Sequence, residues 1–203
     1  MPKLNPQTKE KILSAAEIVF HENGLKGART TSIAQKAGVS RTMLHYYYRT
    51  KEELFYEVLE SSFGFFLNKA RKLFQAEEGL KATIEQIVDL LYDVLTEKPG
   101  LSTFIVNILS ESPELIINLP PFQEEQIPTR FDKLLDEARQ SGEIQADISG
   151  ENLLLNIYGL CAVPYMVTPL IKFKESRTEA EMNTFLNDRK RVVKAFIWNG
   201  IQY

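Results

Sequence analysis

The stretch of residues 31–55, TSIAQKAGVSRTMLHYYYRTKEELF, decides how the whole chain is interpreted. Two short segments with helical spacing are separated by Gly38, Val39 and Ser40. Glycine readily takes the left-handed backbone that ends a helix, and serine is a favoured N-cap of the next helix. Three consecutive tyrosines follow, and they cannot all lie on the buried face of a helix with 3.6 residues per turn. The stretch therefore predicts two helices joined by a tight turn, with aromatic surface left exposed on the second.

The second of these helices has an inner and an outer side. Ile33 and Ala34 are placed where the first helix faces the second, and Val39 and Leu44 are placed on the inner side. Residues four apart on a helix are neighbours on its surface. The side chains that remain to form one continuous outer surface are Arg41, Thr42, His45 and Tyr46.

This outer surface suits the major groove of DNA, where a helix can present its N-terminal residues to base edges. The guanidinium group of Arg41 can bind guanine O6 and N7, and Thr42 and His45 can hydrogen-bond to bases or phosphates. Met43 or Tyr46 can contact the methyl group of thymine. The surface therefore indicates double-stranded DNA as the partner of this protein.

Two further residues are placed to bind phosphates on either side. Thr31 lies at a helix N-terminus, and Lys51 lies in the first turn of the fourth expected helix. Residues 1–51 carry nine Lys and Arg against three Glu, whereas residues 52–203 carry fifteen Lys and Arg against twenty-four Asp and Glu. A basic first quarter favours a polyanionic partner, although solvated helix surfaces explain the charge equally well when it is considered alone.

The rest of the chain predicts an all-α protein. Apolar residues at helical spacing place further helices at residues 12–23, 50–73, 84–95, 103–110, 129–141, 149–168 and 178–199. Thr30 or Thr31 is the expected N-cap of the second helix, and Thr50 with Glu53 forms an expected capping box. The apolar run of residues 153–171 is long enough for a membrane span, but its polar and proline residues favour a buried core helix. The natural division separates residues 1–48 from residues 49–203.

The sequence lacks the patterns of common enzyme and metal sites. Its two histidines, His21 and His45, lie in the first quarter, and it has no zinc-ligand spacing, phosphate-binding glycine loop or Gly-x-Ser-x-Gly motif. Its single cysteine, Cys161, excludes an intramolecular disulfide and is expected as a buried thiol. Because no signal-peptide pattern occurs, a cytoplasmic protein is expected, with no membrane partner. No catalytic residue, cofactor or metal ion is expected.

Residues 8–60 resemble the N-terminal domain of TetR/AcrR-type bacterial transcriptional regulators. The resemblance rests on the first-helix sequence TKEKILSAAEIVFHENG, the Gly-Val-Ser turn, Leu44, Tyr47 and the sequence KEEL that begins at Lys51. It implies a three-helix domain with a helix-turn-helix, followed by a larger helical domain that binds a ligand and dimerises.

The resemblance also implies roles for single residues. Tyr47 and Lys51 are expected to contact phosphates, while the outer surface of the second turn helix lies nearest the bases. His45 stands where the family often has tyrosine, and Tyr48 where it often has phenylalanine, so the base specificity of the family cannot be transferred. The expected DNA-binding residues are Thr31, Ser40, Arg41, Thr42, Met43, His45, Tyr46, Tyr47 and Lys51.

The last two long helices are expected to form a homodimer interface. Their composition alone does not distinguish an obligate interface from an ordinary core. The resemblance implies an interface, because the last two helices of the family pair as a four-helix bundle. Two copies on a two-fold axis read a palindrome. The expected interface residues are Leu153, Ile157, Leu160, Val163, Phe185, Val192 and Phe196.

The middle of the chain has many aromatic residues, most of which are expected in the core. The resemblance implies an effector site between the fourth helix and the helices that follow. Because these segments have few ionisable residues, a largely apolar or aromatic small molecule is expected. The expected effector-binding residues are Phe63, Phe66, Tyr92, Phe104, Asn107, Ile108, Phe131, Asn156, Tyr158, Cys161 and Tyr165.

Together these features predict a ligand-responsive DNA-binding regulator, most simply a repressor that binds a palindromic operator as a homodimer and is released by its effector. Effector binding is expected to shift the fourth helix near Phe63 and Phe66 and to change the separation of the two DNA-contacting helices. The alternative is a helical ligand- or partner-binding protein with an idle DNA-binding head. An idle head, however, has no reason to keep Arg41, Lys51 and its basic charge.

Overall fold

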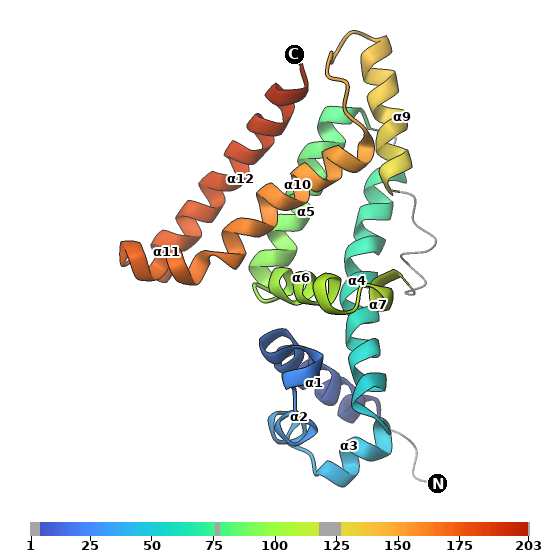
Figure 1. Ribbon diagram of the computed structural model, residues 1–203, viewed down its shortest axis with the longest axis vertical. Helices are drawn as coiled ribbons and strands as arrows, with labels where there is room; N and C mark the ends of the chain where they lie inside the picture. Colours follow the sequence, from blue (N-terminus) through green and yellow to red (C-terminus); the bar gives the residue numbers. More distant parts are fainter. Residues whose placement is uncertain (1–4, 76–77, 118–126, 203) are drawn as a thin grey trace. The chain divides into compact units, whose positions relative to one another are not determined.

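The computed structural model describes residues 5–75, 78–117 and 127–202, with the backbone alone at positions 65, 67, 71, 74 and 75. Throughout these ranges the regular structure is helical and contains no strand, which confirms the predicted all-α fold (Figure 1). The helices are α1 (Pro6–Gly27), α2 (Thr30–Ala37), α3 (Arg41–Tyr47), α4 (Lys51–Gln75), α5 (Leu80–Glu97), α6 (Leu101–Glu111), α7 (Glu114–Ile117), α9 (Ile127–Gln140), α10 (Gly150–Met166), α11 (Thr168–Glu175) and α12 (Glu179–Gln202).

The chain forms two compact units. The head unit comprises Met1–Phe65 and Thr103–Gln123, and the body unit comprises Phe66–Ser102 and Glu124–Tyr203. Helices α4 and α6 therefore each contribute residues to both units. The compact units differ from the division expected after residue 48, and the functional boundary there stays a prediction.

Helix α1 is capped at its start and kinked near its end. The side chain of Asn5 accepts a hydrogen bond from the N–H of Gln7 (2.9 Å), and Pro6 occupies the first helical position. Gly24 has a φ of 62° and interrupts the helix where the sequence predicts its end. A second helical segment follows this kink and ends at Gly27.

The turn between α2 and α3 forms as the sequence predicts. Gly38 adopts a left-handed backbone with φ 67°, and the N–H of Val39 donates to the last turn of α2 (3.0 Å). The hydroxyl of Ser40 then accepts a hydrogen bond from the N–H of Met43 (3.0 Å) and starts α3. The predicted threonine N-cap of α2 is wrong, because Arg29 occupies the cap position without a side-chain hydrogen bond.

The start of α4 confirms part of the predicted capping box. The hydroxyl of Thr50 accepts a hydrogen bond from the N–H of Glu53 (3.1 Å). The carboxylate of Glu53 accepts a hydrogen bond from the N–H of Arg49 (3.0 Å), one residue before the expected partner. These hydrogen bonds fix the first turn of α4, which follows α3 closely in the chain.

Aromatic side chains join α1, α4 and α6 within the head unit. The ring of Phe55 lies 4.9 Å from that of Phe20 and 5.5 Å from that of Phe104. The ring of His21 lies 4.6 Å from that of Phe104. These contacts explain why the C-terminal part of α6 belongs to the same compact unit as α1–α3.

Four helices, α5, α9, α10 and α12, form the core of the body unit (Figure 1). Helix α5 contacts the other three and buries residues along most of its length. Its Asp89 forms ion pairs with Lys190 (2.9 Å) and Lys194 (2.7 Å) of α12. Apolar burial therefore holds α5 in place, while ion pairs at its side fix α12 along it.

The corner between α9 and α10 depends on a glycine. The N–H of Gly150 donates to the carboxylate of Asp132 (2.6 Å), and the backbones of α9 and α10 approach closely at this point. A Cβ atom at residue 150 would lie 2.2 Å from the carbonyl oxygen of Pro128. The helix pair consequently has no space for a side chain at this position.

Helix α10 ends earlier than the sequence predicts. A bend of 48° separates it from α11, where one helix was expected up to Thr168. The hydroxyl of Thr168 donates to the carbonyl of Pro164 (2.9 Å) at this bend. Leu153, Ile157 and Tyr165 are buried as predicted for a core helix, but α11 buries no residue, so the predicted core helix does not extend through residue 171.

No single helix in the described ranges is both long and apolar enough to cross a membrane. The bent pair of α10 and α11 reaches the required length and composition only when its two helices are taken together.

Candidate nucleic-acid interface

Helix α3 follows α2 in the head unit (Figure 1). Its exposed side chains form a polar and aromatic surface. Leu44 is the one α3 residue that is buried, and 1% of it remains exposed. Because this side chain fixes the inner face, the residues around it point outward. The exposed side chains are Arg41, Thr42, Met43, His45 and Tyr46. The helix thus has the outer surface that the sequence predicts, and the contact of that surface with bases stays a prediction.

The three consecutive tyrosines have three different environments. Tyr46 is half exposed, and the ring of Tyr47 packs edge-on against it at 5.7 Å. Tyr48 is buried, as predicted, with 2% exposed. Burial, and to a smaller extent the nearby carboxylate of Glu57, raises the pKa of Tyr48 above its ordinary value. Tyr48 is therefore a neutral core residue, whereas Tyr46 belongs to the surface.

Two of the residues expected to contact phosphates, Tyr47 and Lys51, form hydrogen bonds with the ends of α1. The hydroxyl of Tyr47 accepts from the N–H of Asn5 (2.9 Å) and donates to the carbonyl of the same residue (3.2 Å). The ammonium group of Lys51 donates to the carbonyl of Ala28 (3.3 Å), the C-cap residue of α1. Sequence reasoning missed these contacts, because they join residues far apart in the chain.

Ser40 and Thr31 lie at the starts of the two turn helices. The hydroxyl of Ser40 is used as the N-cap of α3. Thr31 is exposed in the first turn of α2, whose cap residue provides no side-chain acceptor. The N–H groups at this helix end can therefore donate hydrogen bonds to an anion, which is compatible with the predicted phosphate contact of Thr31.

Three of the expected effector residues line a small cavity in the head unit. Phe104 and Ile108 of α6 are buried at its floor, and Asn107 is exposed at its edge. The cavity has a volume of about 220 Å³ and is completed by residues near the end of α1 and by Leu115 of α7. Phe63 is half-buried in α4 and does not line this cavity.

A second group of expected effector residues lies in the body unit. The rings of Tyr92 and Tyr165 are 5.8 Å apart, and the hydroxyl of Tyr165 is 2.7 Å from that of Thr96. Burial raises the pKa of Cys161 to about 12, which keeps this thiol neutral. The side chains of this cluster are therefore neutral and mainly aromatic, and the charged groups of Arg189 and Lys190 lie near enough to act on Cys161.

The remaining effector candidates of the body unit differ in exposure. Phe131 is fully buried, and Phe66 and Tyr158 are half-buried. Asn156 is exposed, since it lies on the side of α10 away from the buried Leu153 and Ile157. The expected contact of Asn156 with an effector stays a prediction.

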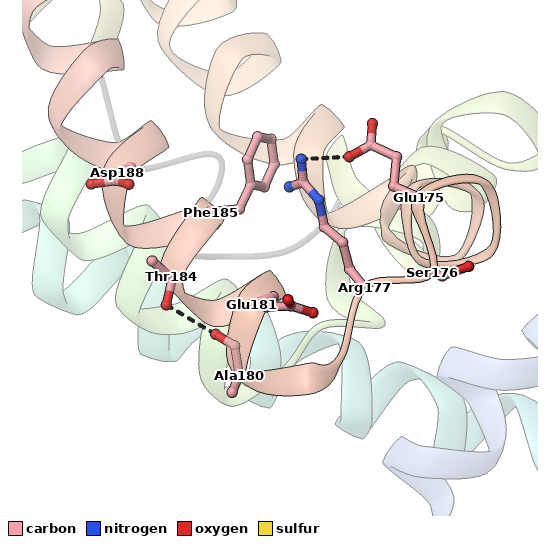
Figure 2. Close-up of a pocket in the computed structure, with 8 residues that line it drawn as sticks. All are labelled: Glu175, Ser176, Arg177, Ala180, Glu181, Thr184, Phe185 and Asp188. Carbon is pink, nitrogen blue, oxygen red and sulfur yellow. Dashed lines mark hydrogen bonds and ion pairs between the residues drawn. The ribbon is translucent and has the colours of Figure 1, made fainter.

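An open pocket with a volume of about 620 Å³ lies beside the connection between α11 and α12. Figure 2 shows the residues that line it. The guanidinium group of Arg177 lies 4.7 Å from the ring of Phe185 and pairs with Glu175 (2.5 Å). Of the residues that the sequence singles out, this pocket contains Phe185, which was expected at a dimer interface. None of the expected effector residues lines it.

The expected dimer residues separate into core and surface. Leu153 and Ile157 keep 1% and 0% exposure, so within one protomer they pack in the core, and this burial does not support their expected place in an interface. Leu160 and Phe185 are half-buried. The exposed apolar side chains of α10 and α12 are Leu155, Val163, Val192 and Phe196. Sequence reasoning missed Leu155, although its place two residues after the buried Leu153 puts it on the opposite side of the helix.

Comparisons with known proteins agree with this geometry. Residues 12–58 match the family model described as "Bacterial regulatory proteins, tetR family". The chain is 35% identical over 112 residues to the HTH-type transcriptional regulator RutR of Escherichia coli, a match that covers 55% of this chain and 52% of RutR. The chain thus spans about half the length of that curated relative. It is also 24% identical to the transcriptional regulator YttP of Bacillus subtilis, over 78% of this chain and 77% of YttP.

Solved structures share the fold over nearly the whole chain. The transcriptional regulator FadR from Bacillus subtilis, crystallised in complex with stearoyl-CoA, has a TM-score of 0.66 at 18% identity and covers 95% of this chain and 99% of its own. The region matched by the family model, residues 12–58, includes the turn between α2 and α3 and the exposed surface of α3. In residues 12–58 the chain is therefore similar to bacterial regulatory proteins of the tetR family.

Proposed function

We propose that the protein is a ligand-responsive transcriptional regulator that binds double-stranded DNA through α3. The observation that carries this proposal is the outer surface of α3, where Arg41, Thr42 and His45 are exposed while Leu44 is buried beneath them. Such a helix can enter the major groove with hydrogen-bonding side chains towards the bases. The basic charge of residues 1–51 favours the approach of a polyanion.

The protein acts as a homodimer on a palindromic operator in this proposal. One helix of seven residues contacts few base pairs, and a two-fold pair doubles the contacted length. The exposed side chains of Leu155 and Val163 on α10 and of Val192 and Phe196 on α12 support a self-complementary apolar interface. Leu160 and Phe185 lie at its edge, and the buried Leu153 and Ile157 have no part in it.

The effector in this proposal is a largely apolar or aromatic small molecule, and the regulator is most simply a repressor that the effector releases from DNA. The uncharged cluster of Tyr92, Cys161 and Tyr165 supports an apolar ligand in the body unit. The FadR protein of the same fold was crystallised with an acyl-CoA, stearoyl-CoA, whose long acyl chain belongs to the same class of ligand. Only a difference in affinity for two states lets such a ligand shift the protein.

The proposal is tested by selecting duplexes from a random DNA pool with the purified protein at two salt concentrations. A recovered palindrome with affinity that falls steeply as salt rises is the expected result. The variant Arg41→Ala should lose the selected sequence, whereas Lys133→Ala, a control at an exposed position of α9, should keep it. No enriched sequence, together with weak binding even at low salt, overturns the proposal and favours a ligand- or partner-binding protein with an idle head.

A further inference from the structure

The hydroxyl of Tyr47 closes a hydrogen-bonded contact between the last residue of α3 and the N-cap residue of α1. Asn5 provides both partners, since its N–H donates to Tyr47 Oη at 2.9 Å and its carbonyl accepts from Oη at 3.2 Å. The two residues are 42 positions apart. We call this contact the Asn5–Tyr47 brace. Asn5 is itself fixed, because its side chain caps α1 through the N–H of Gln7.

The brace limits what Tyr47 can do for a bound phosphate. A tyrosine hydroxyl has one proton, and phosphate oxygens only accept hydrogen bonds. In the brace that proton is directed at the carbonyl of Asn5. Lys51 differs, because its ammonium group has three protons and uses one on Ala28. Lys51 can therefore hold α1 and a phosphate together, whereas a braced Tyr47 has no proton left for a phosphate.

The brace acts at the end of α3, beside the buried C-cap residue Tyr48. The start of α3 is fixed by the Ser40 N-cap, and its middle by the buried Leu44. The last residue, Tyr47, is only half-buried. The orientation of this helix end therefore depends on the buried Tyr48 and on what holds Tyr47. The directions of His45 and Tyr46 depend on it in turn.

We propose that Tyr47 is a positioning residue: through the backbone of Asn5 it fixes the orientation of α3 for DNA, and it does not bind a phosphate. This inference rests on the proposed DNA-binding function. The N–H of Asn5 is the part of the brace that a substitution can remove alone, since the Asn5 carbonyl also accepts from the N–H groups of Thr8 and Lys9, each at 3.1 Å. Removal of this single N–H should therefore weaken DNA binding without removal of any group that faces DNA.

A pair of substitutions at Asn5 isolates this N–H. Asn5 has φ −81° and ψ 116°, values that proline accepts and that suit a residue before Pro6. Asn5→Ala removes the capping side chain and keeps the N–H. Asn5→Pro removes both, so a comparison of the two variants cancels the loss of the cap. Both variants are made in the full chain, once with Tyr47 and once in the Tyr47→Phe background. The measurement is their affinity for a duplex selected by the wild-type protein.

The expected result is an effect of the N–H that requires the Tyr47 hydroxyl. With Tyr47 present, Asn5→Pro should bind the duplex about 2- to 12-fold more weakly than Asn5→Ala, the range of one intramolecular hydrogen bond. In the Tyr47→Phe background the two should bind equally. Tyr47→Phe alone should leave the dependence of affinity on salt unchanged and reduce the preference for the selected sequence.

Three outcomes overturn the inference. Equal binding of Asn5→Pro and Asn5→Ala with Tyr47 present excludes the brace as a determinant of affinity. If the ratio of the affinities of Asn5→Ala and Asn5→Pro for the duplex is the same in the Tyr47→Phe background, the N–H acts independently of Tyr47. Failure of the wild-type protein to bind any duplex overturns the DNA-binding function first and the inference with it, and it is recognised before any variant is made.

Discussion

In the head unit, tyrosines lie at the surface of a short helix, whereas in the body unit they lie inside a bundle of long ones. Tyr46 keeps 50% exposure on α3, and Tyr92 keeps 2% on α5. The head unit orients its side chains through local features, such as the glycine turn and the serine N-cap. The body unit orients them through contacts between residues such as Tyr92 and Tyr165, which are distant in sequence.

The contrast shows why one unit has a recognisable interface and the other does not. Local caps and turns need few residues, so they leave the outer side chains of α3 free to contact a partner. In the body unit the aromatic residues are needed for packing, and a ligand would have to contact these same residues. Substitution of an exposed polar residue in the head unit should therefore change DNA binding, whereas substitution of a closely packed residue in the body unit should change stability.

The largest effect is expected in the body unit, at the corner between α9 and α10. Gly150→Ala would place Cβ 2.2 Å from the carbonyl oxygen of Pro128, so the two backbones must separate. The expected loss of unfolding free energy is about 3 kcal/mol, measured by urea denaturation. Gly64→Ala is the control, since a Cβ there meets nothing within 4 Å and should stabilise α4 by roughly 0.5–1 kcal/mol. Equal stability of Gly150→Ala and the wild type would show that the corner can relax.

A substitution on α3 should change function without changing stability. Arg41→Ala removes an exposed guanidinium group that the proposal assigns to a base. DNA affinity should fall by about 2 kcal/mol, roughly thirtyfold, while the free energy of unfolding changes by less than about 0.5 kcal/mol. Fluorescence anisotropy with the selected duplex measures the first quantity and thermal unfolding the second. A loss of both in parallel would mean that Arg41 supports the fold of the head unit.

Lys51 tests whether a residue that holds α1 also binds a phosphate. Lys51→Met keeps the aliphatic chain and removes the charge, so affinity should fall by about 1 kcal/mol for every duplex sequence alike. The slope of log affinity against log salt should become shallower by about 0.9, the value for one phosphate contact on duplex DNA. An unchanged slope would limit Lys51 to its hydrogen bond with Ala28. Tyr47→Phe is the matched comparison, because its slope is expected to stay constant.

The features that the sequence predicts correctly are those determined by neighbouring residues. The left-handed Gly38, the N-cap Ser40, the buried Tyr48 and the outward side of α3 all follow from spacing within one or two turns. The threonine cap of α2 was wrong, since the chain before α2 places Arg29 at the cap. Local pattern thus determines the type of element, while the path of the chain into a helix determines its first residue.

The features that the sequence does not predict depend on long-range contacts. Leu153 and Leu155 are both apolar, and only the packing of α10 makes the first core and the second surface. The brace between Asn5 and Tyr47 likewise joins residues that no periodicity connects. The limit is physical: an apolar residue suits a core and an interface equally well, and a hydroxyl suits either a backbone group or a phosphate.

The smallest predicted effect concerns charge in the body unit, where acidic and basic groups face each other rather than DNA. Burial alone would raise the pKa of Asp89, but hydrogen bonds from Lys194 and Lys190 outweigh it and hold the pKa below its ordinary value. A lowered carboxyl pKa adds stability that is fully present above the ordinary pKa, about 4, and is lost as pH falls through the lowered value.

Asp89→Asn should therefore lower the unfolding temperature at neutral pH, and its difference from the wild type should shrink below about pH 4. The effect should stay under about 1 kcal/mol, because the Asp89 side chain is 41% exposed and solvent screens its ion pairs. The exposed Asp188 of α12 provides the control, since Asp188→Asn should leave the pH dependence as it is. A difference between Asp89→Asn and the wild type that persists at pH 2 would assign the loss to the changed packing between α5 and α12. In that case, charge would contribute to the molecule mainly in the head unit, where it faces outward.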